Sequence, residues 1–395
     1  MFSFYPIKGG LENVEGFFCG GINCGLKAGK ENDLGFIRSD EEFEVSALFT
    51  SNSFQAAPIV HFKKYPKGFK TNFLLLNSKN ANALTGDAGV LDIEEIFKAL
   101  GEKIELKNPI MSSTGVIGYR LNKEKITSAF DRFDFNSCDS NGVARAIMTT
   151  DSFKKELCLK VELENGEFFH IAAICKGAGM INPAMATMLC FICTDAKIPV
   201  GFADEALKEA IKYSFNAISV DGDTSTNDTV MLLSSGKSGV FNEDAFSEAL
   251  AFLTKQLALE IVKDGEGATK LVAFEVSGAK NEDEAMRAAK ALSNSLLVKT
   301  ALFGEDPNWG RIASTIGASR VSCDVKKFSI HYDDVLVYDE KNPQLDSTRE
   351  ELAAKVMKKD SFKISSYLGV GEASFTAFGC DLGHKYVSIN ADYRS

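Results

Sequence analysis

Residues 176–189 read K-G-A-G-M-I-N-P-A-M-A-T-M-L, the stretch of this chain with the clearest structural and chemical meaning. A basic, glycine-rich turn leads into small and apolar residues that end in Thr187. A threonine hydroxyl is a poor nucleophile until a nearby base removes its proton. Cleavage between Ala186 and Thr187 would supply that base as a new α-amine, whose unperturbed pKa is about 7.7–8. The stretch suggests a self-cleaving threonine nucleophile, with a buried turn and core element as the plain alternative.

Strand-like and helix-like patterns alternate on both sides of this stretch. Leu157 to Cys175 predicts two strands joined by Asn165-Gly166, since both positions of that dipeptide accept the positive φ of a tight hairpin turn. Further strand-like runs lie at 34–50, 72–77, 269–277, 320–338 and 363–392. Helical patterns lie at 91–100, 202–218, 242–263, 281–302 and 347–358, the last opened by the cap Asp346-Ser347-Thr348. The mixture predicts an α+β or layered α/β protein.

Length, charge and hydropathy narrow the class of protein. The 395 residues are enough for two or three domains, with 45% hydrophobic and 25% charged residues as in ordinary globular proteins. The net charge of −10 argues against nucleic acid or an anionic membrane as partner. No window approaches the roughly 18 uninterrupted apolar residues of a membrane span. Residues 1–10 lack the basic and apolar regions of a secretory signal, so we expect a cytoplasmic protein.

The cysteines and several near-matches to known motifs point away from metal and nucleotide chemistry. Nine cysteines without a signal sequence suit reduced thiols, and Cys190 and Cys193 form a C-x-x-C inside an apolar run with no second pair at zinc spacing. We therefore expect Cys190 and Cys193 to be buried structural thiols. We also expect that the protein uses no metal or cofactor. Asn182 replaces the third glycine of a dinucleotide loop, and Met231 replaces the first glycine of a phosphate-binding loop. The chain contains no G-x-S-x-G elbow.

Residues 176–189, with Thr194-Asp195-Ala196 after them, resemble the processing site of the ornithine acetyltransferase family, also called the glutamate N-acetyltransferase family of arginine biosynthesis. The resemblance spans nearly the whole chain, because other family motifs follow in order. They are N-S-K-N-A-N-A with T-G (77–86), S-T-G-V-I-G (113–118), A-I-M-T-T-D (146–151), S-V-D-G-D-T-S-T-N-D (219–228), D-G-E-G-A-T-K (264–270), D-P-N-W-G-R (306–311) and N-A-D-Y-R-S (390–395). The chain departs from the family at Lys79 and Asn182, neither of which is an expected catalytic residue.

The resemblance implies a role for each matching residue. Thr187 is the nucleophile, first for self-cleavage and then for an acetyl-enzyme, and Thr114 (hydroxyl) with Gly115 (backbone N–H) forms the oxyanion hole. The positions that hold substrate are Thr150, with Thr149 a near-equal candidate, Lys176, Thr187, Glu266, Asn390 and Ser395. Lysine and hydroxyl groups suit a carboxylate, and Glu266 suits an ammonium group. Taken alone, the S-T-G turn reads as a plain strand end, and a single Lys or Glu as a solvated surface charge.

The fold and reaction implied by the resemblance complete the expectation. The fold is a layered αββα-type sandwich like that of self-processing aminopeptidases, cleaved into an α chain (1–186) and a β chain (187–395) in an α2β2 heterotetramer. The reaction is ping-pong transfer of acetyl from N-acetylornithine to glutamate, without metal or organic cofactor. Acetyl-CoA as a second donor, which would make the enzyme bifunctional, stays open. So do two alternatives: an N-terminal-nucleophile aminopeptidase or amidohydrolase of this fold, and a non-catalytic binding module.

Overall fold

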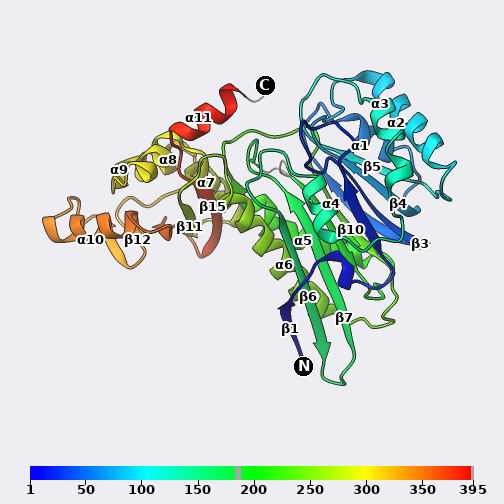
Figure 1. The fold of residues 1–395 in the computed structure, drawn as a ribbon. Helices are drawn as coiled ribbons and strands as arrows, with labels where there is room; N and C mark the ends of the chain where they lie inside the picture. Colours follow the sequence, from blue (N-terminus) through cyan, green and yellow to red (C-terminus); the bar gives the residue numbers. More distant parts are fainter. Residues whose placement is uncertain (183–187, 393–395) are drawn as a thin grey trace. The chain divides into compact units, whose positions relative to one another are not determined.

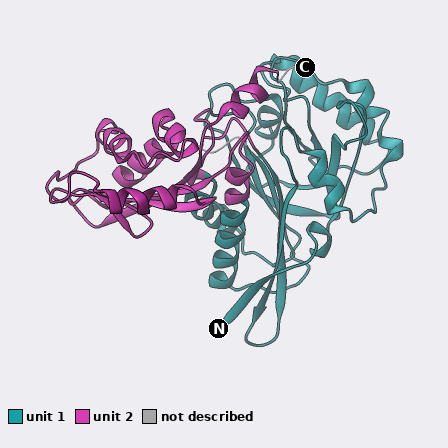
Figure 2. Cartoon of the chain, turned by 60° about the vertical axis from the view of Figure 1, so that its left-hand side comes forward, with its two compact units in different colours: residues 1–177, 184–215, 224–257 teal, residues 178–183, 216–223, 258–395 magenta. Residues whose placement is uncertain are grey.

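A computed structural model describes residues 1–182 and 188–392. The chain forms two compact units (Figure 2). Unit 1 comprises residues 1–177, 184–215 and 224–257, and unit 2 comprises 178–183, 216–223 and 258–395. Each unit contains one sheet with helices packed on it, which confirms the predicted layered α/β fold (Figure 1). The expected division into chains 1–186 and 187–395 falls on residues outside the described part and stays a prediction.

Unit 1 is built on a mixed sheet that has nine strands within the described residues. The hairpin of β6 and β7 lies beside β8, β8 pairs in parallel with β10, and β10 pairs antiparallel with β3. In sheet order the strands are β1 (Phe2–Ile7), β6 (Lys155–Leu163), β7 (Phe168–Lys176), β8 (Leu189–Thr194), β10 (Thr229–Ser234), β3 (Leu34–Phe49), β4 (Lys70–Asn77) and β5 (Ile110–Ser113), with β2 (Phe18–Ile22) paired to β3.

The helices of unit 1 bury apolar side chains, and in the longer helices these recur every three or four residues. They are α1 (Ala57–Phe62), α2 (Gly86–Leu100), α3 (Lys123–Thr127), α4 (Ser140–Ala146), α5 (Phe202–Lys212) and α6 (Glu243–Lys263), the last of which contributes its final residues to unit 2. In α2, Val90, Ile93 and Phe97 lie on one helical face. They share a core with Phe36 of β3 and Phe73 of β4. Burial of such side chains contributes roughly 1.5–3 kcal/mol each.

Unit 2 has a second mixed sheet with its own core. Its strands in sheet order are β13 (Val335–Tyr338), β12 (Ser329–Tyr332), β14 (Ser361–Tyr367), β11 (Leu271–Ala279), β15 (Ala373–Cys380) and β9 (Ile218–Ser219). Its helices are α7 (Glu282–Asn294), α8 (Leu296–Phe303), α9 (Trp309–Ala318), α10 (Ser347–Met357) and α11 (His384–Ala391). The buried alanines Ala285, Ala288 and Ala289 let α7 approach β11 and β15 closely, against Phe274.

Most of the predicted elements are confirmed. Strands occupy 34–49 and 70–77, the Leu157–Cys175 hairpin is present, and Asp346 caps α10 by accepting the Arg349 N–H at 2.9 Å. In the hairpin turn only Gly166 has positive φ (+84°), since the Asn165 side chain instead accepts the Glu167 N–H. No helix within the described ranges is long and apolar enough to cross a membrane.

Four predicted elements are wrong in extent or type. The helix expected at 202–218 ends at Lys212, and a short 3₁₀ helix (Phe215–Ala217) and the start of β9 follow it. The helix expected at 281–302 is two helices, because Ser295 leaves helical geometry and caps α8. The strand expected from 320 begins only at Ser329, since a turn built on Asp324 precedes it. The run 363–392 contains two strands but ends in the helix α11. The β-branched residues in its sequence disfavour a helix. Long-range hydrogen bonds of Tyr386 and Asn390 nevertheless stabilise α11.

Candidate functional site

The predicted oxyanion residues form a turn directly after β5 in unit 1. Thr114 is buried, and its N–H donates to the carbonyl of Asn77 at 3.0 Å, so the hydroxyl is the polar group that Thr114 can offer a ligand. Gly115 has a φ of +131°, and a Cβ there would lie 2.2 Å from the carbonyl carbon of Lys79. Only glycine fits this close approach of two backbones.

The segment facing this turn has an unusual backbone. Lys79, Asn82 and Leu84 all have positive φ (72°, 47° and 56°), a conformation that costs energy for residues with a side chain. Asn77 supports the segment, since its Nδ2 donates to the carbonyl of Asn80 at 3.0 Å and its Oδ1 accepts the Ser113 hydroxyl at 2.6 Å.

A second group of predicted residues in unit 1 gathers around the buried carboxylate of Asp151. Its oxygens accept the Gly177 N–H (2.7 Å), the Thr149 N–H (3.0 Å) and the Lys155 ammonium (2.8 Å), and the Lys176 Nζ lies 4.0 Å away. The side chains of Asp151, Lys155 and Lys176 are at most 4% exposed. Lys176 is therefore not a solvated surface charge, and Asp151 joins it to the Thr149–Thr150 segment.

The charges of this cluster act on one another at short range. The Asp151 carboxylate lies 2.8 Å from the Lys155 ammonium and 4.0 Å from the Lys176 ammonium. Burial alone raises the pKa of Asp151, but Lys176 and Lys155 outweigh it and lower that pKa to about 2. Burial lowers the pKa of Lys27, and the nearby charge of Lys176 adds to that effect. The buried Lys176 ammonium is suited to an anionic ligand such as a carboxylate.

The depressed pKa of Asp151 predicts an acid-sensitive unit 1. A carboxyl group whose pKa falls from 3.8 to about 2 on folding stabilises the fold above pH 4, and this stabilisation is lost as the pH falls toward 2. The free energy involved is about 2 kcal/mol, at 1.36 kcal/mol per pKa unit. Urea unfolding at several pH values should show this loss in wild type and a smaller one in Asp151→Asn/Lys155→Met, which replaces both charges. Equal pH dependence of the two proteins would contradict the assignment.

Unit 2 contains the other described residues of the predicted site. Glu266 is buried, its backbone N–H donates to the carbonyl of Ala178 at 2.8 Å, and its Oε2 accepts the Asn390 Nδ2 at 2.7 Å. A Cβ on Gly179 would lie 2.4–2.5 Å from the Glu266 carboxyl group, so glycine makes room for it. At Gly267 (φ +77°) a Cβ would lie 2.7 Å from the Tyr386 nitrogen, so this glycine lets α11 pack closely.

The residues just before the predicted cleavage point are anchored by Asp221, which sequence reasoning did not single out. Its carboxylate accepts the Met180 N–H (2.5 Å) and the Ile181 N–H (2.8 Å). The Tyr386 hydroxyl donates to the same carboxylate at 3.2 Å. Burial and then the charge of Asp221 raise the pKa of Tyr386. Asp221, in the motif 219–228, thus anchors the backbone at residues 180 and 181, and no local sequence pattern reveals this contact.

The structure brings together only part of the predicted site. Asp151 links Lys176 to the backbone of Thr149, next to Thr150, in unit 1. The Thr114–Gly115 turn is a separate feature of that unit, and Glu266 with Asn390 belongs to unit 2. The cleavage residues Ala186 and Thr187 and the terminal Ser395 lie outside the described residues, so their expected roles stay predictions.

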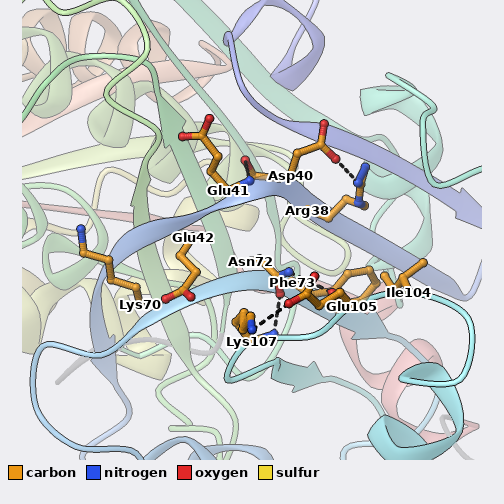
Figure 3. Close-up of a pocket in the computed structure, with 11 residues that line it drawn as sticks. Arg38, Asp40, Glu41, Glu42, Lys70, Asn72, Phe73, Ile104, Glu105 and Lys107 are labelled. Carbon is orange, nitrogen blue, oxygen red and sulfur yellow. Dashed lines mark hydrogen bonds and ion pairs between the residues drawn. The ribbon is translucent and has the colours of Figure 1, made fainter.

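Three further features of the described residues were considered as sites: the C-x-x-C cysteines, groups that could hold a metal, and a surface hollow. Cys190 and Cys193 are fully buried in β8, and burial raises the pKa of both thiols, as expected for structural cysteines. Residues 1–182 and 188–392 contain no group of three or more His, Cys, Asp or Glu placed to hold a metal. A polar hollow of about 630 Å³ lies over β3 and β4, lined by side chains that include Arg38, Asn72 and Lys107 (Figure 3).

Comparison with known proteins gives one consistent family. The profile of the ArgJ family matches residues 18–395. The "Arginine biosynthesis bifunctional protein ArgJ" of Wolinella succinogenes is 56% identical over 100% of both chains. The "Glutamate N-acetyltransferase" of Methanocaldococcus jannaschii is 40% identical over 98% of this chain and 99% of its own. A crystal structure of the bifunctional ArgJ protein from Bacillus halodurans covers 51% of this chain and 97% of its own, at 40% identity and a TM-score of 0.49.

Proposed function

Because the chain belongs to the ArgJ family, we propose that it is a glutamate N-acetyltransferase of arginine biosynthesis that moves acetyl from N-acetylornithine to glutamate. The structural observation that carries the proposal is the buried ammonium group of Lys176, whose Nζ lies 4.0 Å from the Asp151 carboxylate, beyond hydrogen-bond distance. Both amino-acid substrates have an α-carboxylate, and a buried ammonium group is a suitable partner for it.

The proposed mechanism begins with cleavage between Ala186 and Thr187, which gives chains 1–186 and 187–395. The new α-amine takes the proton of the Thr187 hydroxyl, and the oxygen attacks the acetyl carbonyl of N-acetylornithine. The Thr114 hydroxyl and the Gly115 N–H stabilise the oxyanion. Ornithine leaves with the proton, and the glutamate amine then attacks the acetyl ester and regenerates Thr187. One amide bond is broken and one is made, so no other source of energy is required.

The remaining residues hold the amino-acid parts of the substrates. Lys176 and Thr150 bind the α-carboxylate, with Thr149 the alternative to Thr150. Glu266, which Asn390 holds through the 2.7 Å hydrogen bond, binds an ammonium group, and Ser395 contributes at the chain terminus. The Asn390 partner is a neutral amide donor, and a carboxylate can accept further hydrogen bonds from a cationic ligand. An α2β2 assembly and acetyl-CoA as a further donor belong to the same proposal.

The alternative that shares this chemistry is an N-terminal-nucleophile amidohydrolase, in which water resolves the acyl-enzyme. A donor panel distinguishes the two: purified protein with N-acetylornithine or acetyl-CoA, with and without glutamate, analysed for N-acetylglutamate and free acetate. Acetyl transfer that requires glutamate supports the proposal. Net release of acetate at an equal rate without glutamate would favour the hydrolase, and an uncleaved, inactive chain would favour a binding module.

Replacing Glu266 by glutamine should weaken the use of amino acids and leave self-cleavage intact, because cleavage involves no external ammonium group. Loss of one charged hydrogen-bond partner costs about 1.5–3 kcal/mol, roughly a ten- to hundredfold rise in KM. Steady-state kinetics and intact mass measure the two effects. Glu275→Gln is the matched control, since Glu275 is a carboxylate of unit 2 that pairs with Lys363 at 3.0 Å. Normal KM values, or a failure to cleave, would show that Glu266 has another role.

A further inference from the structure

The side chain of Asn227 connects three segments of unit 1 that are far apart in the sequence. It is 6% exposed, and its Nδ2 donates to the carbonyl of Ala81 at 2.6 Å and to the carbonyl of Ser113 at 2.8 Å. Its Oδ1 accepts the Thr226 hydroxyl at 2.7 Å. Both amide protons therefore bind main-chain carbonyls of other segments, and the amide orientation is determined by its partners.

The Ser113 carbonyl belongs to the peptide unit that immediately precedes Thr114. The other end of this unit, the Thr114 N–H, donates to the carbonyl of Asn77 at 3.0 Å. Asn227 and Asn77 thus hold one peptide plane from both sides. On the far side of Gly115, the Val116 N–H donates to the carbonyl of Lys79 at 3.0 Å. With its neighbours held in this way, the direction of the Gly115 N–H and of the Thr114 side chain is determined by hydrogen bonds.

From this geometry we infer that Asn227 is a positioning residue for the oxyanion turn. The inference rests on the proposed function, because it assigns to Asn227 the task of aiming the Thr114 hydroxyl and the Gly115 N–H. Such donors stabilise a transition state only when they already point to where the charge develops. A misplacement of about 1 Å lowers a rate by about 10²-fold. Asn227 acts through the turn and does not touch the reacting atoms.

An asparagine suits this task better than other small polar residues. A serine hydroxyl has one proton and can satisfy only one of the two carbonyls. An alanine leaves both carbonyls in a buried site without this donor. Asn227 also belongs to the motif 219–228, whose Asp221 anchors a different segment, so this motif supplies two separate backbone supports.

The test compares Asn227→Ala with Thr114→Ala and with the double variant, in the cleaved enzyme. We expect Asn227→Ala to lower kcat by about 10²-fold with KM values within about threefold, as for loss of an interaction made in the transition state. If both residues serve one oxyanion hole, the double variant should be little slower than the slower single variant. Asn227→Ser replaces Asn227→Ala if the latter is insoluble, with a smaller loss expected.

Asn72 supplies the matched control. It lies on β4 and clamps a loop in the same manner, since its Nδ2 donates to the carbonyl of Glu105 at 2.9 Å and its Oδ1 accepts the Lys107 N–H at 2.8 Å (Figure 3). Asn72→Ala should retain kcat within about twofold, as expected away from the reaction. Equal losses in the two variants, independent losses that multiply in the double variant, or an unchanged kcat in Asn227→Ala would each overturn the inference alone. Wild type without acetyl transfer would overturn the proposed function and the inference with it.

Discussion

Thr187→Ala should abolish both self-cleavage and acetyl transfer. The proposed ester forms on the Thr187 oxygen, and the base that activates this oxygen is the amine that cleavage creates, so one substitution removes both steps. Removal of a covalent nucleophile lowers kcat by about 10⁶-fold. Intact mass should show one species of 42.9 kDa for the variant and two fragments for wild type, the second beginning at Thr187.

Two further substitutions keep a nucleophilic group at position 187 and change either its methyl group or its attacking atom. Thr187→Ser should retain some cleavage and transfer, because the hydroxyl remains and only the methyl group that restrains χ1 is lost. Thr187→Cys should cleave and then turn over slowly, since a thioester changes the balance of the two half-reactions. Active protein whose only N-terminus is Met1 would contradict the nucleophile assignment, as would wild-type activity in Thr187→Ala.

Local sequence patterns predict those elements whose stability is local. The hairpin of β6 and β7 follows from alternating residues and a glycine turn, and α2 follows from its apolar spacing. The helix α11 could not be predicted in this way. Its residues favour strand, no side chain caps its N-terminus, and it is stabilised by contacts from Tyr386 to Asp221 and from Asn390 to Glu266. These partners are more than 100 residues away in the sequence.

The same distinction between local sequence patterns and long-range contacts applies to the candidate site. Family motifs identify Lys176 and Glu266, but their burial and their partners depend on the fold. A charge pattern read along the chain gives no sign that Lys155 and Lys176 share one carboxylate, because alternation in β6 and β7 alone does not say which side chains meet. The roles of Asp151, Asp221 and Asn227 come from hydrogen bonds to backbone groups of distant segments. Such bonds leave no spacing pattern in a single sequence.

Thr114→Ala should leave the nucleophile in place and slow its reaction. The Thr114 N–H is already engaged with the carbonyl of Asn77, so the substitution removes the hydroxyl donor and keeps the backbone of the turn. Loss of one oxyanion donor lowers kcat by about 10²–10³-fold. Thr254→Ala is the matched control, because Thr254 is a buried threonine of unit 1 whose hydroxyl donates within α6, to the carbonyl of Leu250 at 2.9 Å. It should leave kcat nearly unchanged.

The decisive measurement for Thr114 is the rate at which the acetyl-enzyme forms. N-acetylornithine without acceptor should add about 42 Da, one acetyl group, to the chain that begins with Thr187. The addition should appear quickly in wild type and in Thr254→Ala, slowly in Thr114→Ala, and not at all in Thr187→Ala. An unchanged rate in Thr114→Ala, or a defect in KM alone, would mean that the hydroxyl binds substrate and does not stabilise the oxyanion. An acetyl group found on Lys176 or on a cysteine would instead show that the nucleophile itself is misassigned.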